Sequence, residues 1–295
     1  MALQRSFRYH VVDVFTRQAL EGNALAVFPD GFGLDDALMQ KIARELNLSE
    51  TVFVFAPALP TCAARLRIFT PFRELPFAGH PTVGASFVLL EEGIVPKGTG
   101  RFLLEELVGP VPVRVEAQDR PLIWLTTPPL QEGPVFDRAI AAEALGLDGG
   151  DLLDATPQLL TAGNPTVFVG VKDRETVDRA WLELAGMRRL RGDYPEPVCV
   201  FVFAPTTEGA YSRMFAPEYG IAEDPATGSS TGPLAVYMTR HGLVSGAAGT
   251  RFVSEQGTSM GRRSMLHVRL QGERGSDAIE VGGYVTPLAQ GTMQI

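Results

Sequence analysis

The hexapeptide VFVFAP occurs twice in this chain of 295 residues, at 52–57 and at 200–205, 148 positions later (200 − 52). Three other landmarks recur in the same order at offsets between 141 and 149 positions: GNA and GNP at 22–24 and 163–165, RIFTP and RMFAP at 67–71 and 213–217, and PFAGHPT and PATGSST at 76–82 and 225–231. Self-similarity on this scale predicts two homologous domains in tandem, with a site between them. We place the domains at residues 1–125 and 126–295, with TTPP at 126–129 as the crossover and the last strand able to return to the first domain.

Composition narrows the possible partners. The chain is 45% hydrophobic, enough for two cores, and carries 26 basic against 34 acidic residues, a net charge of −8. Because there is no basic stripe, nucleic acid and anionic membranes are poor candidates as partners. No apolar run is long enough to span a bilayer, and the N-terminal stretch lacks a signal-peptide pattern. We therefore expect a cytoplasmic protein.

Cysteine and histidine are too sparse for a disulfide framework or a zinc site. Cys62 and Cys199 do not match across the repeat, and the four histidines have no metal-ligand spacing. We expect buried packing roles for both cysteines and no bound metal.

Periodicity predicts the elements of both halves. In the first half we expect strands at 8–15, 24–28, 51–55 and 65–69 and helices at 34–46 and 81–92; in the second, strands at 198–203 and 210–215 and a helix at 230–241, with Pro233 in its first turn. The helices at 81–92 and 230–241 are apolar around most of their circumference, which is typical of buried helices. Each domain should therefore be a curved sheet around one buried helix.

Both buried helices start next to a glycine and a polar residue, Gly79-His80 and Gly228-Ser229. A helix N-terminus presents free N–H groups and a partial positive charge, so these starts are candidates to hold a carboxylate or an oxyanion. The alternative is that they are ordinary caps and turns. Their recurrence in both halves gives the functional interpretation the same weight as this alternative.

Each half contributes one acid that the other lacks. Glu50 lies two residues before the first hexapeptide, where the second copy has Val198, and Asp224 stands where the first copy has Leu75. Acids beside apolar strands and helix starts are candidates for proton transfer. The alternatives are that Glu50 caps a turn with Asn47 and Ser49, and that Asp224 is a turn residue before proline.

The sequence resembles the PhzF family of phenazine-biosynthesis-like isomerases. Its motifs are NLSETVFV at 47–54, FRELPFAGHPTVGA at 72–85 and APEYGIAEDPATGSSTGPLAVY at 216–237, with GNALAVF, GNP and the GGYVTPL tail extending the likeness over the chain. The resemblance implies an α+β fold like that of diaminopimelate epimerase, with two similar domains, each a barrel-like, mostly antiparallel sheet around a central helix. It also implies proton transfer without cofactor or metal, commonly in a homodimer.

The same resemblance assigns roles to individual residues. Glu50 matches the principal acid/base, and His80, Asp224 and Ser229 match its supporting residues. The substrate-binding surround matches Ser49, Gly79, Gly228 and Ser230. Related epimerases and racemases use a cysteine pair at the two helix starts; Ala78 and Thr227 stand there instead, which excludes that thiol chemistry.

The predicted function is isomerisation of a small carboxylate by moving a proton between carbons, with Glu50 as the carrier. The family's reference reaction, in phenazine biosynthesis, isomerises a dihydro-hydroxyanthranilate, but the sequence leaves the substrate open. Two alternatives stay open as well. One is a binding or protein-interaction member of the fold without turnover, and the other is a carboxylate-based racemase or epimerase.

Overall fold

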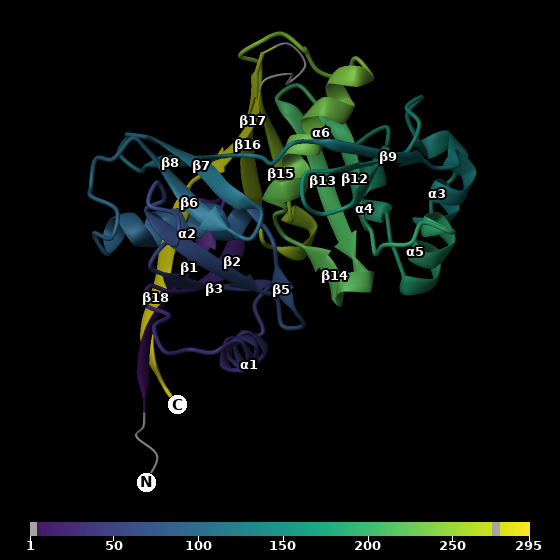
Figure 1. Ribbon diagram of the computed structural model, residues 1–295. Helices are drawn as coiled ribbons and strands as arrows, with labels where there is room; N and C mark the ends of the chain where they lie inside the picture. Colours follow the sequence, from purple (N-terminus) through teal and green to yellow (C-terminus); the bar gives the residue numbers. More distant parts are fainter. Residues whose placement is uncertain (1–4, 273–277) are drawn as a thin grey trace. The chain divides into compact units, whose positions relative to one another are not determined.

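The computed structural model describes residues 5–272 and 278–295 (Figure 1). The first four residues of the stretch inspected for a signal peptide therefore lie outside the described part. The chain forms two compact units: the first ends at Thr126 and takes up the chain again at Gly282–Ile295, and the second is Thr127–Val281. Within the described ranges no helix is long and apolar enough to cross a membrane. The fold is α+β.

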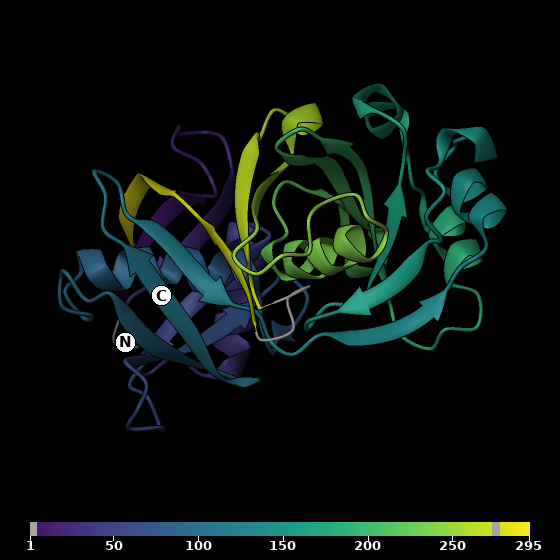
Figure 2. The ribbon, with the colours of Figure 1, turned by 90° about the horizontal axis from the view of Figure 1, so that it is seen from above.

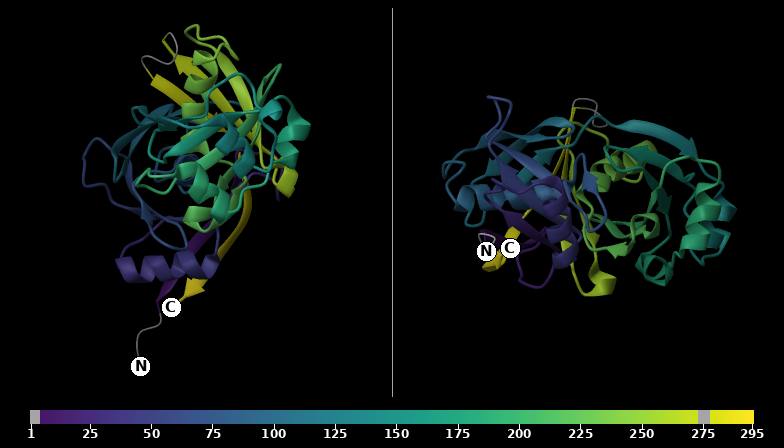
Figure 3. Two further views of the ribbon diagram at one scale, coloured as in Figure 1. Left: turned by 90° about the vertical axis from the view of Figure 1, so that its right-hand side faces the viewer. Right: turned by 60° about the horizontal axis from the view of Figure 1, so that its bottom comes forward.

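The first unit is a mostly antiparallel sheet. Its strands are β1 (Ser6–Val14), β2 (Asn23–Phe28), β3 (Glu50–Phe55), β4 (Ala64–Phe69), β5 (Glu74–Leu75), β6 (Arg101–Glu106), β7 (Gly109–Glu116), β8 (Leu122–Thr126) and β18 (Val285–Gln294). They pair in the order β18-β1-β2-β3-β4-β6-β7-β8, with β5 added to β4, and only β2–β3 and β4–β6 are parallel. The last strand thus lies beside the first, as the yellow and purple arrows in Figure 3 show.

The second unit repeats this order. Its strands are β9 (Gln131–Val135), β10 (Gln158–Thr161), β11 (Thr166–Gly170), β12 (Cys199–Thr206), β13 (Gly209–Ala216), β14 (Ile221–Asp224), β15 (Arg251–Gln256), β16 (Ser264–Gln271) and β17 (Ala278–Gly283). They pair as β9-β10-β11-β12-β13-β15-β16-β17, with β14 added to β13, and here too the corresponding pairs, β11–β12 and β13–β15, are parallel. The two hexapeptides lie on β3 and β12, so the prediction that they occupy equivalent strands is confirmed.

The hexapeptide copies are nevertheless one residue out of step. Glu50 on β3 lies opposite Leu25 on β2. The residue that corresponds to Leu25, counted from the Gly-Asn landmark, is Thr166, and it lies opposite Cys199 on β12. The structural counterpart of Glu50 is therefore Cys199, and the sequence-based match with Val198 is wrong.

The opposite edge of the same strands gives the same shift. Phe53 lies opposite Arg67 on β4, whereas Val202 lies opposite Arg213, the matching landmark on β13. Both arginines form an ion pair with an acid on the next strand, Glu74 for Arg67 and Glu223 for Arg213. The arginine landmarks are thus equivalent in structure, and the hexapeptides between them are displaced by one position.

A shift of one residue moves a side chain to the other face of a sheet. Phe53 packs with Phe28 and Phe69 beneath α1 (Asp36–Leu46), the helix predicted at 34–46. In the second unit Phe201 and Phe203 face the opposite way, into the cluster formed around the buried helix. The identical sequences therefore reflect a shared preference for apolar, β-forming residues. The phenylalanines of the two copies point to opposite faces of their sheets.

Each sheet curves around one buried helix, as predicted. These helices are α2 (Gly79–Glu91) and α6 (Gly228–Arg240), each thirteen residues long and buried nearly all round. Figure 2 shows α6 on the concave side of its sheet. The outer face of the second sheet carries α3 (Arg138–Ala144), α4 (Arg174–Arg179) and α5 (Leu184–Arg191), whose apolar side chains join the outer core.

The predicted starts of α2 and α6 are two residues late. The helices begin at Gly79 and Gly228, so the polar residue that follows each glycine is already in the first turn. Pro233 is the sixth residue of α6, and the prediction that it lies in the first turn is wrong. A proline there has no N–H to donate to the Ser229 carbonyl four residues back.

Candidate active site

The first unit brings Glu50 and His80 together. Glu50 is the first residue of β3, and His80 is the second residue of α2. Glu50 Oε2 lies 3.3 Å from His80 Nε2, with 13% of the glutamate side chain and 4% of the histidine side chain exposed. The register explains the meeting, because Glu50 lies on the same face of β3 as Val52, opposite to Phe53 and the α1 cluster.

Asn23, the first residue of β2, sets the tautomer of His80. Its side-chain amide nitrogen lies 3.4 Å from His80 Nδ1. An amide nitrogen only donates, so Nδ1 must accept, and the ring proton is then on Nε2, the ring atom that lies 3.3 Å from Glu50 Oε2. Burial lowers the pKa of His80 to about 3, so the imidazole is neutral near pH 7. His80 thus places an N–H close to the Glu50 carboxyl group, although Nε2 forms no hydrogen bond among the described residues.

The second unit holds its acid in a network of hydroxyl and amide groups. Thr227, the residue before α6, donates its hydroxyl to Asp224 Oδ2 over 2.5 Å. Gln256, at the end of β15, accepts from the Thr227 backbone N–H at 3.1 Å. Its amide nitrogen donates to the Asp224 carbonyl at 2.7 Å and to the Thr227 hydroxyl at 3.0 Å. Asp224 is 7% exposed, and this network fixes its direction.

The start of α6 is anchored by two further hydrogen bonds to β11 and the turn before it. Asn164 donates its amide to Ser229 Oγ at 3.0 Å, and the hydroxyls of Ser230 and Thr166 are 2.8 Å apart. Asn164 is the repeat counterpart of Asn23, so each unit uses the same asparagine to hold the polar residue in the first turn of its buried helix. The Gly-Asn landmark was recognised in the sequence, but this positioning role of its asparagine was missed.

The other sequence-predicted residues fall around these two clusters. Gly79 and Gly228 are buried at the first positions of α2 and α6, where the backbone N–H groups lack intrahelical acceptors. Ser49 is half-buried, directly before β3. Ser230 is fully buried and bonded to Thr166, which makes it a support of the helix start.

The helix starts carry no thiol. Ala78 and Thr227 are the residues before α2 and α6, as the sequence predicted, and Cys62 and Cys199 are both buried. Among the described residues there is no group of three or more His, Cys, Asp or Glu side chains placed to hold a metal ion.

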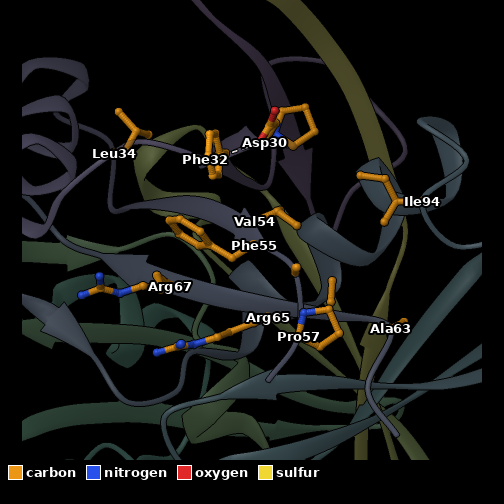
Figure 4. A pocket seen from close by; sticks show the side chains of 13 residues that line it. Asp30, Phe32, Leu34, Val54, Phe55, Pro57, Ala63, Arg65, Arg67 and Ile94 are labelled. Atoms are coloured by element: carbon orange, nitrogen blue, oxygen red, sulfur yellow. Dashed lines mark hydrogen bonds between the residues drawn. The ribbon is translucent and has the colours of Figure 1, made fainter. Parts of the chain in front are cut away.

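A separate pocket of about 490 Å³ opens at the far end of β3 (Figure 4). Its lining includes Phe32, Phe55, Arg65 and Ile94 and none of the predicted site residues. Phe55 is five residues along β3 from Glu50, roughly 16 Å at the usual rise of a strand. The pocket is therefore distinct from the Glu50–His80 cluster.

Comparison with known proteins identifies the family. The family described as "Phenazine biosynthesis-like protein" matches residues 12–291. A Pseudomonas aeruginosa protein named trans-2,3-dihydro-3-hydroxyanthranilate isomerase is 38% identical over 288 residues, which cover 96% of this chain and 98% of that protein.

Two solved structures have the same fold. A Bacillus anthracis phenazine biosynthesis protein of the PhzF family superposes with a TM-score of 0.88 at 22% identity, covering 99% of this chain and 100% of that chain. A predicted epimerase from Pseudomonas aeruginosa has a TM-score of 0.81 at 32% identity, covering 97% of this chain and 99% of that one. Matched over nearly its whole length by the family and by a curated isomerase, the chain belongs to the phenazine biosynthesis-like, or PhzF, family of isomerases.

Proposed function

We propose that this isomerase moves a proton between two carbons of a small carboxylate substrate, with Glu50 as the proton carrier. The observation that carries the proposal is the approach of Glu50 Oε2 to His80 Nε2 at 3.3 Å beside the start of a buried helix. A pure scaffold has no need to place an acid at the head of an apolar strand beside a buried, neutral imidazole.

The chemistry requires one group that both accepts and returns a proton. The Glu50 carboxylate takes a proton from a substrate C–H bond, and the electron pair of that bond is delocalised over the substrate. The protonated Glu50 then gives the same proton to another carbon, and the enzyme returns to its starting state. One carboxyl group is sufficient, so the reaction balances without a co-reactant.

His80 orients Glu50 in this scheme. Its pKa of about 3 makes the ring a poor proton donor or acceptor near neutral pH. Its Nε2–H can instead hold one oxygen of the carboxylate in place, leaving the other for the substrate. This is a change from the simplest view of the histidine, in which it shuttles the proton itself.

We propose that the cluster of the second unit serves the same reaction. Asp224, held by Thr227, can accept a hydrogen bond from a donor group on the substrate, and Ser229 offers a hydroxyl positioned by Asn164. The backbone N–H groups at Gly79 and Gly228 favour a carboxylate or a developing oxyanion, despite the net charge of −8. Ser49 completes the proposed substrate surround.

The first substrate to test is trans-2,3-dihydro-3-hydroxyanthranilate, which names the reaction of the Pseudomonas aeruginosa relative. It is a small cyclic carboxylate, and the isomerisation of such a compound is a proton transfer between carbons. Other cyclic amino and hydroxy acids form the comparison set.

The test is incubation of each compound with the protein in D2O, followed by mass spectrometry and NMR. Wild type should isomerise one of them, and Glu50→Gln should lose roughly 10² to 10⁴ fold in turnover. Glu45→Gln is the matched control, because it makes the same change on the exposed side of α1, close in the chain. Undiminished turnover in Glu50→Gln would remove Glu50 as carrier, and binding of a carboxylate without turnover or exchange would favour the non-catalytic alternative.

A further inference from the structure

Glu106 is a buried acid that the proposed reaction does not use. It is the last residue of β6 and is 4% exposed. Its Oε1 lies 2.6 Å from the hydroxyl oxygen of Thr82, and the carboxyl group lies close to the backbone N–H of Ala78. In the described part of the chain its Oε2 is buried and has no hydrogen-bond partner. The side chain therefore lies against the start of α2.

The contacts of Thr82 show that this acid needs a proton. Thr82 Oγ1 is 2.8 Å from the carbonyl oxygen of Ala78, which can only accept a hydrogen bond. A hydroxyl group has a single proton, and here the carbonyl takes it. The contact of 2.6 Å between Thr82 and Glu106 is then best made by a carboxylic acid that donates its own O–H to the hydroxyl oxygen.

The repeat supports the same conclusion independently. Glu105 on β6 lies opposite Arg65, and Glu255 on β15 lies opposite Tyr211, so the strands align and Glu106 corresponds to Gln256. Gln256 accepts a hydrogen bond from the backbone N–H of Thr227, the residue before α6, and Glu106 lies close to the backbone N–H of Ala78, the residue before α2. The second unit thus fills this position with a neutral group that both donates and accepts, and Glu106 has that property only when it is protonated.

We propose that Glu106 is a positioning residue: as a neutral carboxylic acid it braces the first turn of α2, which carries Gly79 and His80, and ionisation of Glu106 loosens that turn. Ala78 has no side chain that could cap the helix, and Glu106 takes over the task from a neighbouring strand. The effect on isomerisation rests on the proposed function, whereas the effect on the helix start does not.

The electrostatic surroundings agree with this role. Burial raises the pKa of Glu106 to about 8. Glu105 points to the other face of β6, where it lies 3.9 Å from Arg65. His80, in the braced turn itself, is the titratable group that must be separated from Glu106 in any pH experiment.

The two groups can be separated because they act in opposite directions. Glu106 has a folded pKa of about 8 above its ordinary 4.5, so the stability it contributes is complete below pH 4.5 and is lost as pH rises to 8. His80 has a folded pKa of about 3 below its ordinary 6.5, so it costs stability only below pH 6.5. Between pH 6.5 and 8, any change of stability with pH that arises in this turn is therefore due to Glu106.

The experiment measures amide hydrogen exchange in the first turn of α2, corrected for the intrinsic pH dependence of exchange, together with thermal unfolding. In wild type, the protection of this turn should fall by up to about tenfold per pH unit between pH 6.5 and 8. Glu106→Gln should abolish the slope and raise the melting temperature at pH 8. Glu106→Leu should lose protection at every pH, because leucine cannot form the hydrogen bond to Thr82.

The matched control is Gln256→Glu, which places the same acid at the equivalent position of the second unit. In this variant the protection of the start of α6 against hydrogen exchange should fall between pH 6.5 and 8, whereas in wild type it should not. An unchanged slope in Glu106→Gln, or a flat profile for the start of α6 in Gln256→Glu, would overturn the proposal. With an active substrate, Glu106→Leu should lower kcat at pH 7 and Glu106→Gln should restore it; failure of that arm alone would count against the positioning effect on catalysis.

Discussion

The two buried helices start in the same way and carry different chemistry. At equivalent positions around these starts, the first unit has Glu50, Ala78, His80 and Glu106, and the second has Cys199, Thr227, Ser229 and Gln256. The backbone arrangement is shared: an asparagine, at the start of β2 in the first unit and in the turn before β11 in the second, contacts the polar residue of the first turn. The side chains differ: at these positions the first unit has two acids and an imidazole, and the second has thiol, hydroxyl and amide groups.

The acid of the second unit shows that neighbouring side chains differ together between the two units. Asp224 stands where the first unit has Leu75, and Thr227, which donates to it, stands where the first unit has Ala78. A buried carboxylate without a donor would be costly, so the acid and its hydroxyl partner belong together. The role of a polar residue in one unit is therefore best inferred together with the residues that contact it. The equivalent residues of the other unit show which of these side chains changed together.

The largest effect expected from this division concerns the two acids. Glu50→Gln removes the proposed proton carrier and should lose roughly 10² to 10⁴ fold in turnover. Asp224→Asn removes a charge that accepts hydrogen bonds, so it should lose only about tenfold to 100-fold, mainly in kcat/KM. Steady-state kinetics of both variants, with deuterium exchange into substrate, would measure the contrast. A greater loss of exchange in Asp224→Asn than in Glu50→Gln would reverse the assignment of roles.

The second prediction uses the imidazole that has no titratable counterpart in the second unit. His80 has a folded pKa of about 3 below its ordinary 6.5, so its contribution to stability is complete above pH 6.5 and is lost as pH falls toward 3. The slope is about 1.4 kcal/mol per pH unit, and it should stand out in a Glu106→Gln background, where the opposing slope is absent. Urea unfolding of Glu106→Gln between pH 4 and 7 should show this acid slope.

The control for that slope is the double variant Glu106→Gln with His80→Gln. Its free energy of unfolding should change much less between pH 4 and 7, because the remaining side chain does not titrate. If the acid slope persisted unchanged in the double variant, another group would be its source, and the neutral, buried state of His80 would be contradicted.

Much of this arrangement could be predicted from the sequence, and there are physical reasons why some of its contacts could not. The repeat, the buried helices and the positions of Glu50, His80, Asp224 and Ser229 were predicted because apolar periodicity and paired landmarks are local patterns. Glu106 and Gln256 were missed because they reach the helix starts from strands far along the chain. Sequence distance conceals such contacts, although the repeat alignment could have paired the two residues.

The hexapeptide shows the opposite difficulty. Its six identical residues led to a correct strand and a wrong register, because an apolar strand covered on both faces keeps its β propensity when it shifts by one. The polar landmarks Arg67 and Arg213 mark the true register, since each must reach an acid on a fixed face. Polar contacts specify register more strictly than apolar identity does.

A third prediction tests the fixed network of the second unit. Thr227→Val removes the hydroxyl that donates to Asp224 and accepts from Gln256, and should cost about 1–3 kcal/mol of unfolding free energy. Thr239→Val, near the other end of α6, is the matched control. Its hydroxyl is buried and has no hydrogen-bond partner within the described residues, so its removal should be neutral or stabilising. Equal losses in both variants, measured by urea unfolding, would show that the network adds nothing beyond packing.

The prediction with the smallest expected effect tests the register of the hexapeptide through the coupling between phenylalanine side chains. If the identical residues were equivalent, Phe201 would couple to Phe215 as Phe53 couples to Phe69, since the latter pair lies edge-on with ring centroids 5.7 Å apart. In the structure Phe201 and Phe215 belong to cores on opposite faces of the sheet, and Phe201 instead lies 5.6 Å from Phe168. Double-mutant cycles with leucine should give coupling energies of about 0.5–1.5 kcal/mol for the two contacting pairs and near zero for Phe201 with Phe215. Coupling between Phe201 and Phe215 as large as that between Phe53 and Phe69 would restore the in-step register and, with it, Val198 as the counterpart of Glu50.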